Sequence, residues 1–123
     1  MIAYPDIEAI VVEYLADLFA TAHVATKRAQ PGSNEPLQIV VNGGYAETMD
    51  EVRRMASVVI EVLHEDSVTA TDMALQVESA IREIKGQVIK RVDVTLGPVR
   101  VSEDGPFEKR SMSVDFVVKG SDI

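Results

Sequence analysis

The chain has 123 residues, of which 46% are hydrophobic and 26% are charged, a composition that fits one globular domain spanning 1–123. It contains no cysteine, which excludes disulfides, thiolate metal ligands and cysteine nucleophiles. Its net charge of −8 excludes a basic nucleic-acid-binding surface and repels anionic lipid headgroups. The first residues lack a signal-peptide pattern, and no apolar run approaches the roughly 18 residues of a membrane span, so we expect no membrane association.

The first predicted element is an amphipathic helix over residues 7–19. Pro5 and Asp6 favour a helix start, and the apolar residues that follow recur every three or four positions. These apolar residues are Ile7, Ile10, Val11, Tyr14, Leu15, Leu18 and Phe19. Residues 1–22 carry four acids and no base, so this helix is expected to expose a negative surface.

Two strands joined as a hairpin are predicted next, over residues 23–28 and 37–42. The segment 31–36 between them is rich in turn-forming residues, and Leu37, Ile39 and Val41 alternate with Gln38, Val40 and Asn42. We interpret Gly43 and Gly44 as the end of the second strand, where glycine supplies a positive φ. Residues 42–54 are then expected to form an exposed loop with charges of both signs.

The middle of the chain predicts a central strand followed by a second helix. The β-branched run at 55–63 is typical of a strand covered on both faces. Ser67, Thr69 or Thr71 is expected to cap the helix, and Gly86 is expected to follow its end. The apolar stripe of this helix consists of Ala70, Met73, Ala74, Val77, Ile81 and Ile84.

Three strands are predicted to complete the chain, over residues 88–96, 99–102 and 112–119, with a charged turn at 103–110. The element order is therefore α-β-β-β-α-β-β-β. This order predicts an α/β protein of the α+β type, with a mixed, mainly antiparallel sheet flanked by two helices that cover one face.

No catalytic or ligand-binding pattern stands out. A phosphate-binding loop needs a lysine before serine or threonine, whereas residues 43–50 contain no lysine and carry Glu47 and Asp50. His23 and His64 lie at different strand ends and lack metal-ligand spacing. We therefore expect a protein that is not an enzyme and that needs no cofactor and no metal.

Three stretches of the sequence carry a resemblance to a known family. They are DIEAIVVEYLADLF running into HVATKRAQPGSNEP, then QIVVNGGYAETMDEVRRMASVVIEVLHED, and finally TATDMALQVESAIREI with the closing strand SMSVDFVVKG. In the order and pattern of these elements, nearly the whole chain resembles the lambda-type tail terminator proteins of long-tailed bacteriophages.

The resemblance implies a small α/β subunit that assembles into a ring, usually a hexamer, on the completed tail tube. Such a ring ends tube polymerisation and offers a surface for joining the head, so the implied partners are further copies of the chain, the tail tube protein and the head–tail connector protein. The implied location is the virion, at the head–tail junction, after synthesis in the bacterial cytoplasm. Six copies would carry about 48 negative charges, and we expect DNA to pass through without specific binding.

Contacts in a ring join two different patches, and loops that project from a sheet are suited to making them. The expected contact residues in the first loop are Gly43, Gly44, Tyr45, Glu47, Asp50, Glu51, Arg53 and Arg54. Those in the second are Glu103, Asp104, Lys109 and Arg110. Changing both Arg53 and Arg54 to glutamate is expected to weaken assembly while leaving the monomer folded.

Three other interpretations stay open at this point. The chain could be another virion part, such as a head-closure protein or a tail-tube subunit, although a tube subunit would favour more strand and a long insertion hairpin, which the sequence does not clearly show. It could be a small α+β enzyme or ligand-binding domain, which would need a pocket with converging polar groups. It could also be a dimerisation module.

Overall fold

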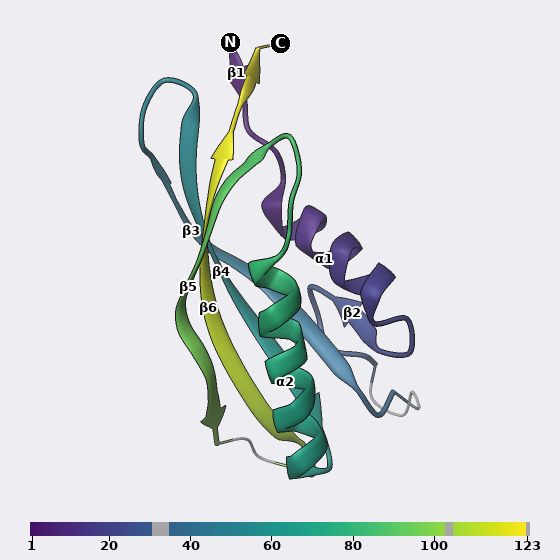
Figure 1. Cartoon of the computed structure of the whole chain (residues 1–123). Coiled ribbons are helices and arrows are strands. Elements are labelled where there is room, and N and C mark those ends of the chain that lie inside the picture. Colours follow the sequence, from purple (N-terminus) through teal and green to yellow (C-terminus); the bar gives the residue numbers. More distant parts are fainter. Residues whose placement is uncertain (31–34, 103–104, 123) are drawn as a thin grey trace.

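The computed structural model describes residues 1–30, 35–102 and 105–122 and contains a five-stranded sheet with two helices (Figure 1). The elements are β1 (Ile2–Ala3), α1 (Ile7–Leu18), β2 (His23–Ala25), β3 (Gln38–Thr48), β4 (Arg53–His64), α2 (Ser67–Arg82), β5 (Ile89–Val101), β6 (Glu108–Lys119) and β7 (Ser121–Asp122). The sheet order is β2-β3-β4-β6-β5, while β1 and β7 form a separate ribbon that joins the two ends of the chain. This arrangement confirms the predicted fold class, a mixed and mainly antiparallel sheet with two helices.

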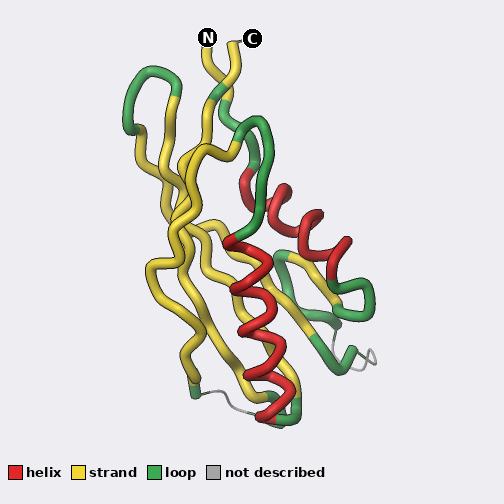
Figure 2. The backbone as a smooth tube through the Cα atoms, viewed as in Figure 1, coloured by secondary structure: helices red, strands yellow, loops and turns green. Residues whose placement is uncertain are grey.

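One face of the sheet carries the hydrophobic core. Alternate residues of β4 and β6, from Ala56 to Val62 and from Met112 to Val118, join one buried cluster with residues of both helices. Both helices therefore cover the same face, as Figure 2 shows. The expectation that residues 55–63 are covered on both faces was wrong, because Ser57, Val59 and Glu61 point to the other face and stay partly exposed.

Each helix begins at an aspartate. Asp6 Oδ1 accepts a hydrogen bond from the backbone N–H of Ala9 at 3.1 Å, as its position before the first apolar stripe predicted. The second helix is capped by Asp66, rather than by a serine or threonine, and its Oδ2 accepts hydrogen bonds from Thr69 N at 2.8 Å and Thr69 Oγ1 at 2.7 Å. The same helix ends with its cap at Glu83, so the expected role of Gly86 at its end was wrong.

The first two strands of the sheet run parallel, so the predicted hairpin at 23–42 was wrong. His23 lies opposite Gln38 and Ala25 lies opposite Val40 in a parallel register. A parallel pair needs a connection of about a dozen residues to bring the chain back to the start of the strand, and residues 26–37 supply that length. The proposed turn at 31–36 falls partly on residues 31–34, which lie outside the described residues.

The strands predicted at 88–96 and 99–102 form one continuous strand, β5. The Gly97–Pro98 step does not end it but shifts its register against β6 between Leu96 and Val99. The following turn is also shorter than predicted, because β6 already begins at Glu108 and includes Lys109 and Arg110.

Candidate subunit interface

Residues 42–54, here called the arm, form the outer half of the β3–β4 hairpin and not the loop that was predicted. The third strand continues through both glycines to Thr48, where it lies opposite Arg54 of β4, with an irregularity between Gly43 and Tyr45. Neither glycine adopts a positive φ, which among the described residues occurs at Gly105 alone. Figures 1 and 2 show the arm projecting from the sheet at the end where the chain termini meet.

The outer edge of the arm is open. The second strand covers only residues 38–40 of β3, and no other described strand lies along the rest of that edge. At the point where this cover ends, the backbone N–H of Gly43 donates a hydrogen bond to Glu8 Oε2 of α1 at 2.5 Å. Because an exposed strand edge offers unpaired backbone groups, the arm is a surface on which another chain can pair.

Asp50 and Arg53 hold the tip of the arm closed. Asp50 Oδ1 accepts hydrogen bonds from Val52 N at 2.9 Å and Arg53 N at 2.8 Å, and Asp50 Oδ2 lies 2.7 Å from an Arg53 guanidinium nitrogen. The hydrogen bond from Val52 and then the side chain of Arg53 hold the pKa of Asp50 below its ordinary value of 3.8. These two expected contact residues therefore form the turn of the arm.

The tip of the arm, on its β4 side, packs against both chain ends. The guanidinium of Arg54 lies 4.2 Å from the ring centroid of Tyr4, a cation–π contact, and Gly120 N donates to the carbonyl of Val52 at 2.7 Å. A side chain at Gly120 would collide with Ile2, so this glycine allows the close approach.

The arm's remaining charges are two glutamates. Glu47 and Glu51 are exposed, and within the described part of the chain neither has a hydrogen-bond or ion-pair partner. They are therefore the expected contact residues in the arm whose charges stay available to a neighbouring molecule.

The described residues of the second expected contact segment make contacts within the fold. Glu103 and Asp104 lie outside the described residues. Lys109 Nζ lies 2.6 Å from Glu61 Oε2, and both side chains are mostly buried.

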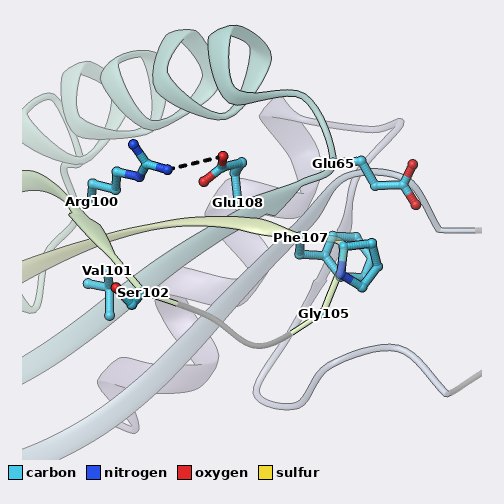
Figure 3. Close-up of a pocket in the computed structure, with 8 residues that line it drawn as sticks. Glu65, Arg100, Val101, Ser102, Gly105, Phe107 and Glu108 are labelled. Atoms are coloured by element: carbon cyan, nitrogen blue, oxygen red, sulfur yellow. Dashed lines mark hydrogen bonds and ion pairs between the residues drawn. The ribbon is translucent and has the colours of Figure 1, made fainter.

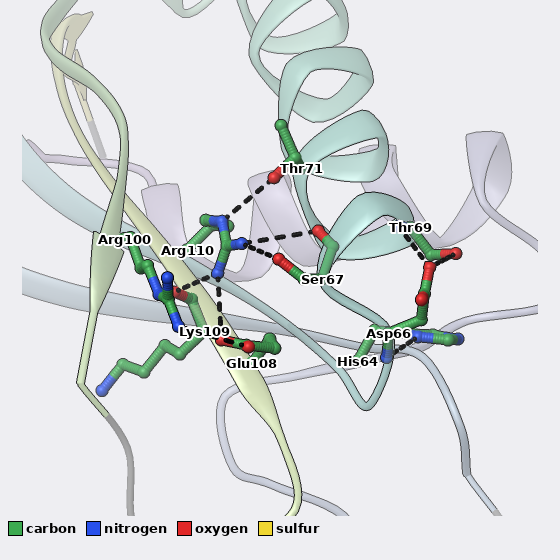
Figure 4. Close-up of polar contacts among 9 residues, drawn as sticks. All are labelled: His64, Asp66, Ser67, Thr69, Thr71, Arg100, Glu108, Lys109 and Arg110. Atoms are coloured by element: carbon green, nitrogen blue, oxygen red, sulfur yellow. Dashed lines mark hydrogen bonds and ion pairs between the residues drawn. The ribbon is translucent and has the colours of Figure 1, made fainter.

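Arg110 is also buried and links β6 to the first turn of α2 (Figure 4). It donates hydrogen bonds to Ser67 Oγ at 2.9 Å and to Thr71 Oγ1 at 3.2 Å. The interpretation of Arg110 as an exposed turn residue was wrong. Arg110, Met112 and Val114 follow one another at intervals of two residues, so they lie on the same face of β6, the core face. This spacing is the sequence signal that indicates the burial of Arg110.

The opposite end of the sheet holds a shallow cavity of about 300 Å³, lined by residues that include Glu65, Arg100, Phe107 and Glu108 (Figure 3). Arg100 and Glu108 pair with each other at 3.4 Å. Across the ranges that the structure describes, no group of three or more histidine or acidic residues could hold a metal ion.

His64 has a local structural contact, because its Nδ1 accepts a hydrogen bond from Asp66 N at 2.9 Å, just before α2. Of the two helices described, neither is long and apolar enough to cross a bilayer.

The sequence matches no protein-family model, and it matches none of the curated proteins with which it was compared. The resemblance to tail terminators therefore stays a prediction, and the function is proposed from that resemblance together with the geometry of the arm.

Proposed function

We propose that this protein is a tail terminator of a long-tailed bacteriophage, a structural subunit whose ring caps the tail tube. The observation that carries the proposal is the arm, a strand ribbon with an open edge that projects from a rigid sheet. A ring forms when one patch of each subunit binds a different patch of the next and the rotation closes. A projecting element at one end of the subunit provides the first of these two patches.

In this role the ring acts through the complementary shapes of its two binding faces. One face fits the last ring of tube subunits, and tube growth stops because the other face does not reproduce the tube's own end. That second face is instead the surface that the head–tail connector protein binds. The required partners are thus further copies of this chain, the tail tube protein and the connector protein, and the place of action is the head–tail junction of the virion.

The acidic balance of the chain suits a ring through which DNA passes. The net charge is −8, and the sheet face that the helices leave uncovered includes Asp93 and Asp115, which lie directly opposite each other on β5 and β6. Asp115 accepts a hydrogen bond from Ser57 Oγ at 2.6 Å, and Arg91 lies 2.9 Å from Asp93. Because Arg91 balances Asp93, the repulsion of the phosphate backbone rests on the net charge of −8, and DNA would move past the ring without being held.

The proposal is tested on tail tubes assembled from the tube protein of the same phage. Gold-labelled protein viewed by negative-stain microscopy should mark one end of each tube and stop its elongation. Labelling along the tube wall, or incorporation within the growing tube, would favour a tube subunit instead. Tubes that elongate unlabelled would contradict the proposed role.

A further inference from the structure

A cleft of about 690 Å³, here called the terminal cleft, opens beside the tip of the arm. Ile2, Val52 and Val88 give it an apolar floor, and the first two of these are more than a third exposed. Lys90 and Lys119 also line it. The terminal cleft thus combines an apolar surface with two cations. The two chain ends, which contribute Ile2 and Asp122 to its lining, lie at the end of the molecule from which the arm projects (Figure 1).

The two lysines of the terminal cleft are unneutralised. Across residues 1–30, 35–102 and 105–122, neither ammonium group has a hydrogen-bond or ion-pair partner. Asp122, the acid among the lining residues, pairs at 3.3 Å with the N-terminal ammonium group. Lys119 lies opposite Arg53 in the pairing of β4 with β6, but the charge of Arg53 is balanced by Asp50. A partner that fills this cleft must therefore be acidic and partly apolar.

The tip of the arm has both properties. Met49 is 49% exposed, and it lies between Glu47 and Glu51, whose carboxylates have no partner in the described structure. A methionine side chain is flexible and fills irregular apolar surfaces well. The arm of one subunit and the terminal cleft of another are therefore complementary in charge and in apolar surface.

We infer that, in the proposed ring, each subunit inserts the tip of its arm into the terminal cleft of the next. Met49 then covers the apolar floor, while Glu47 and Glu51 pair with Lys90 and Lys119. The inference rests on the proposed function, because it names the two different patches that a ring contact requires. Since Val52 in the arm tip of the receiving subunit lines the cleft, the contact brings the tips of neighbouring arms together.

DNA is the other acidic partner that two lysines could attract. The apolar floor argues against it, because a sugar–phosphate backbone leaves Ile2, Val52 and Val88 uncovered. The overall charge of −8 also opposes DNA binding, whereas it leaves a local contact between complementary charges intact.

The inference is tested with two charge-reversal variants measured by sedimentation velocity. The arm variant carries Glu47→Lys and Glu51→Lys, and the cleft variant carries Lys90→Glu and Lys119→Glu. Each places like charges in the contact, so each alone should self-associate at least about tenfold more weakly than the wild type. Circular dichroism checks that both remain folded. A control with Glu13→Lys and Asp17→Lys changes the net charge as the arm variant does but on α1, and it should assemble like the wild type.

Mixing the two variants gives the decisive result. Every contact between unlike subunits then pairs opposite charges, so the mixture should recover assembly with a one-to-one composition. Wild-type assembly by either variant alone, or a mixture of folded variants that stays dissociated, would overturn the inference. So would DNA binding by the wild type that is lost in the cleft variant while self-association is unchanged.

The outcomes separate this inference from the proposed function. Variants that cap tubes as the wild type does would overturn the arm–cleft contact and leave the tail role standing. A wild type that assembles through this contact but fails to cap tubes would overturn the tail role alone.

Discussion

Glu8 of α1 accepts a hydrogen bond from the backbone N–H of Gly43 on the outer edge of β3, with 2.5 Å between Oε2 and N. The two residues are 35 positions apart, and their contact lies where the cover of β2 on that edge ends. A Cβ atom at Gly43 would lie 3.0 Å from the same carboxylate oxygen. Glycine therefore allows the carboxylate to approach closely here, and it does not adopt the positive φ that the sequence suggested.

This contact predicts that Glu8→Ala loosens the base of the arm. Without the carboxylate, the Gly43 amide loses its partner and exchanges with solvent more readily. Hydrogen exchange followed by NMR should show faster exchange at Gly43 in this variant. The matched control is Glu13→Ala, on an exposed position of the same helix, and equal protection of Gly43 in both variants would contradict the prediction.

A second prediction concerns the buried arginine. Arg110→Ala leaves the hydroxyls of Ser67 and Thr71 without their donor and opens space beneath α2, so the free energy of unfolding should fall by about 2–3 kcal/mol. Urea denaturation measures this free energy of unfolding.

The control for this prediction is Arg100→Ala, whose exposed side chain pairs with Glu108 at 3.4 Å. That change should stay within about 0.5 kcal/mol. Equal losses in the two variants would show that burial of Arg110 adds nothing to stability.

A third prediction follows from the cap of α2. Hydrogen bonds from the Thr69 side chain and then its backbone hold the pKa of Asp66 below its ordinary value of 3.8. A lowered folded-state pKa contributes stability that is present above 3.8 and is lost as pH falls through the folded value. Asp66→Asn keeps a good capping residue but removes the titration. The stability advantage of the wild type over this variant should therefore shrink as pH falls below 3.8.

Thermal unfolding at a series of pH values checks this third prediction. Asp72→Asn serves as the control, because Asp72 is an exposed acid of the same helix with no hydrogen-bond partner in the described residues. A wild-type advantage over Asp66→Asn that is independent of pH would contradict the assignment.

A fourth prediction concerns DNA. Fluorescence anisotropy with a labelled duplex should show no binding by the wild type at physiological salt, since a chain of charge −8 releases few counterions from DNA. Saturable binding that weakens with added salt would contradict the view that DNA passes through unheld.

The arm also changes which residues should be mutated to test assembly. Reversing Arg53 and Arg54 removes both the Asp50 pair and the Tyr4 contact at the tip, so it damages the arm itself. Loss of assembly in that double variant would not distinguish a lost subunit contact from a lost arm. Glu47 and Glu51 have no such internal partners, and their reversal tests the contact alone.

The parts of the fold that bury apolar residues could be predicted from the sequence. Val11 and Leu15 follow the helical period, and Val114 and Phe116 belong to the alternation of β6. Because these residues must be buried, the helix and the strand each leave a periodic pattern of apolar residues in the sequence. The parallel pairing of β2 with β3 could not be predicted, because three residues at 23–25 are too few to show a periodic pattern.

The candidate interface was predicted in position but not in form. Residues 42–49 are mostly exposed on both sides, so no alternation of apolar and polar residues marks the ribbon as strand. Its glycines and acids therefore gave the same pattern as a loop. The terminal cleft was not predicted either, since Ile2, Val52, Lys90 and Lys119 come from four distant parts of the chain.

Native mass spectrometry of the wild-type protein, taken up to millimolar concentration, tests the central claim most directly. The proposed ring predicts a closed assembly of about six copies, near 80 kDa for a 13.4 kDa subunit. A chain that remains a monomer, or stops at a symmetric dimer, across the whole concentration range would contradict the proposal that it forms a ring.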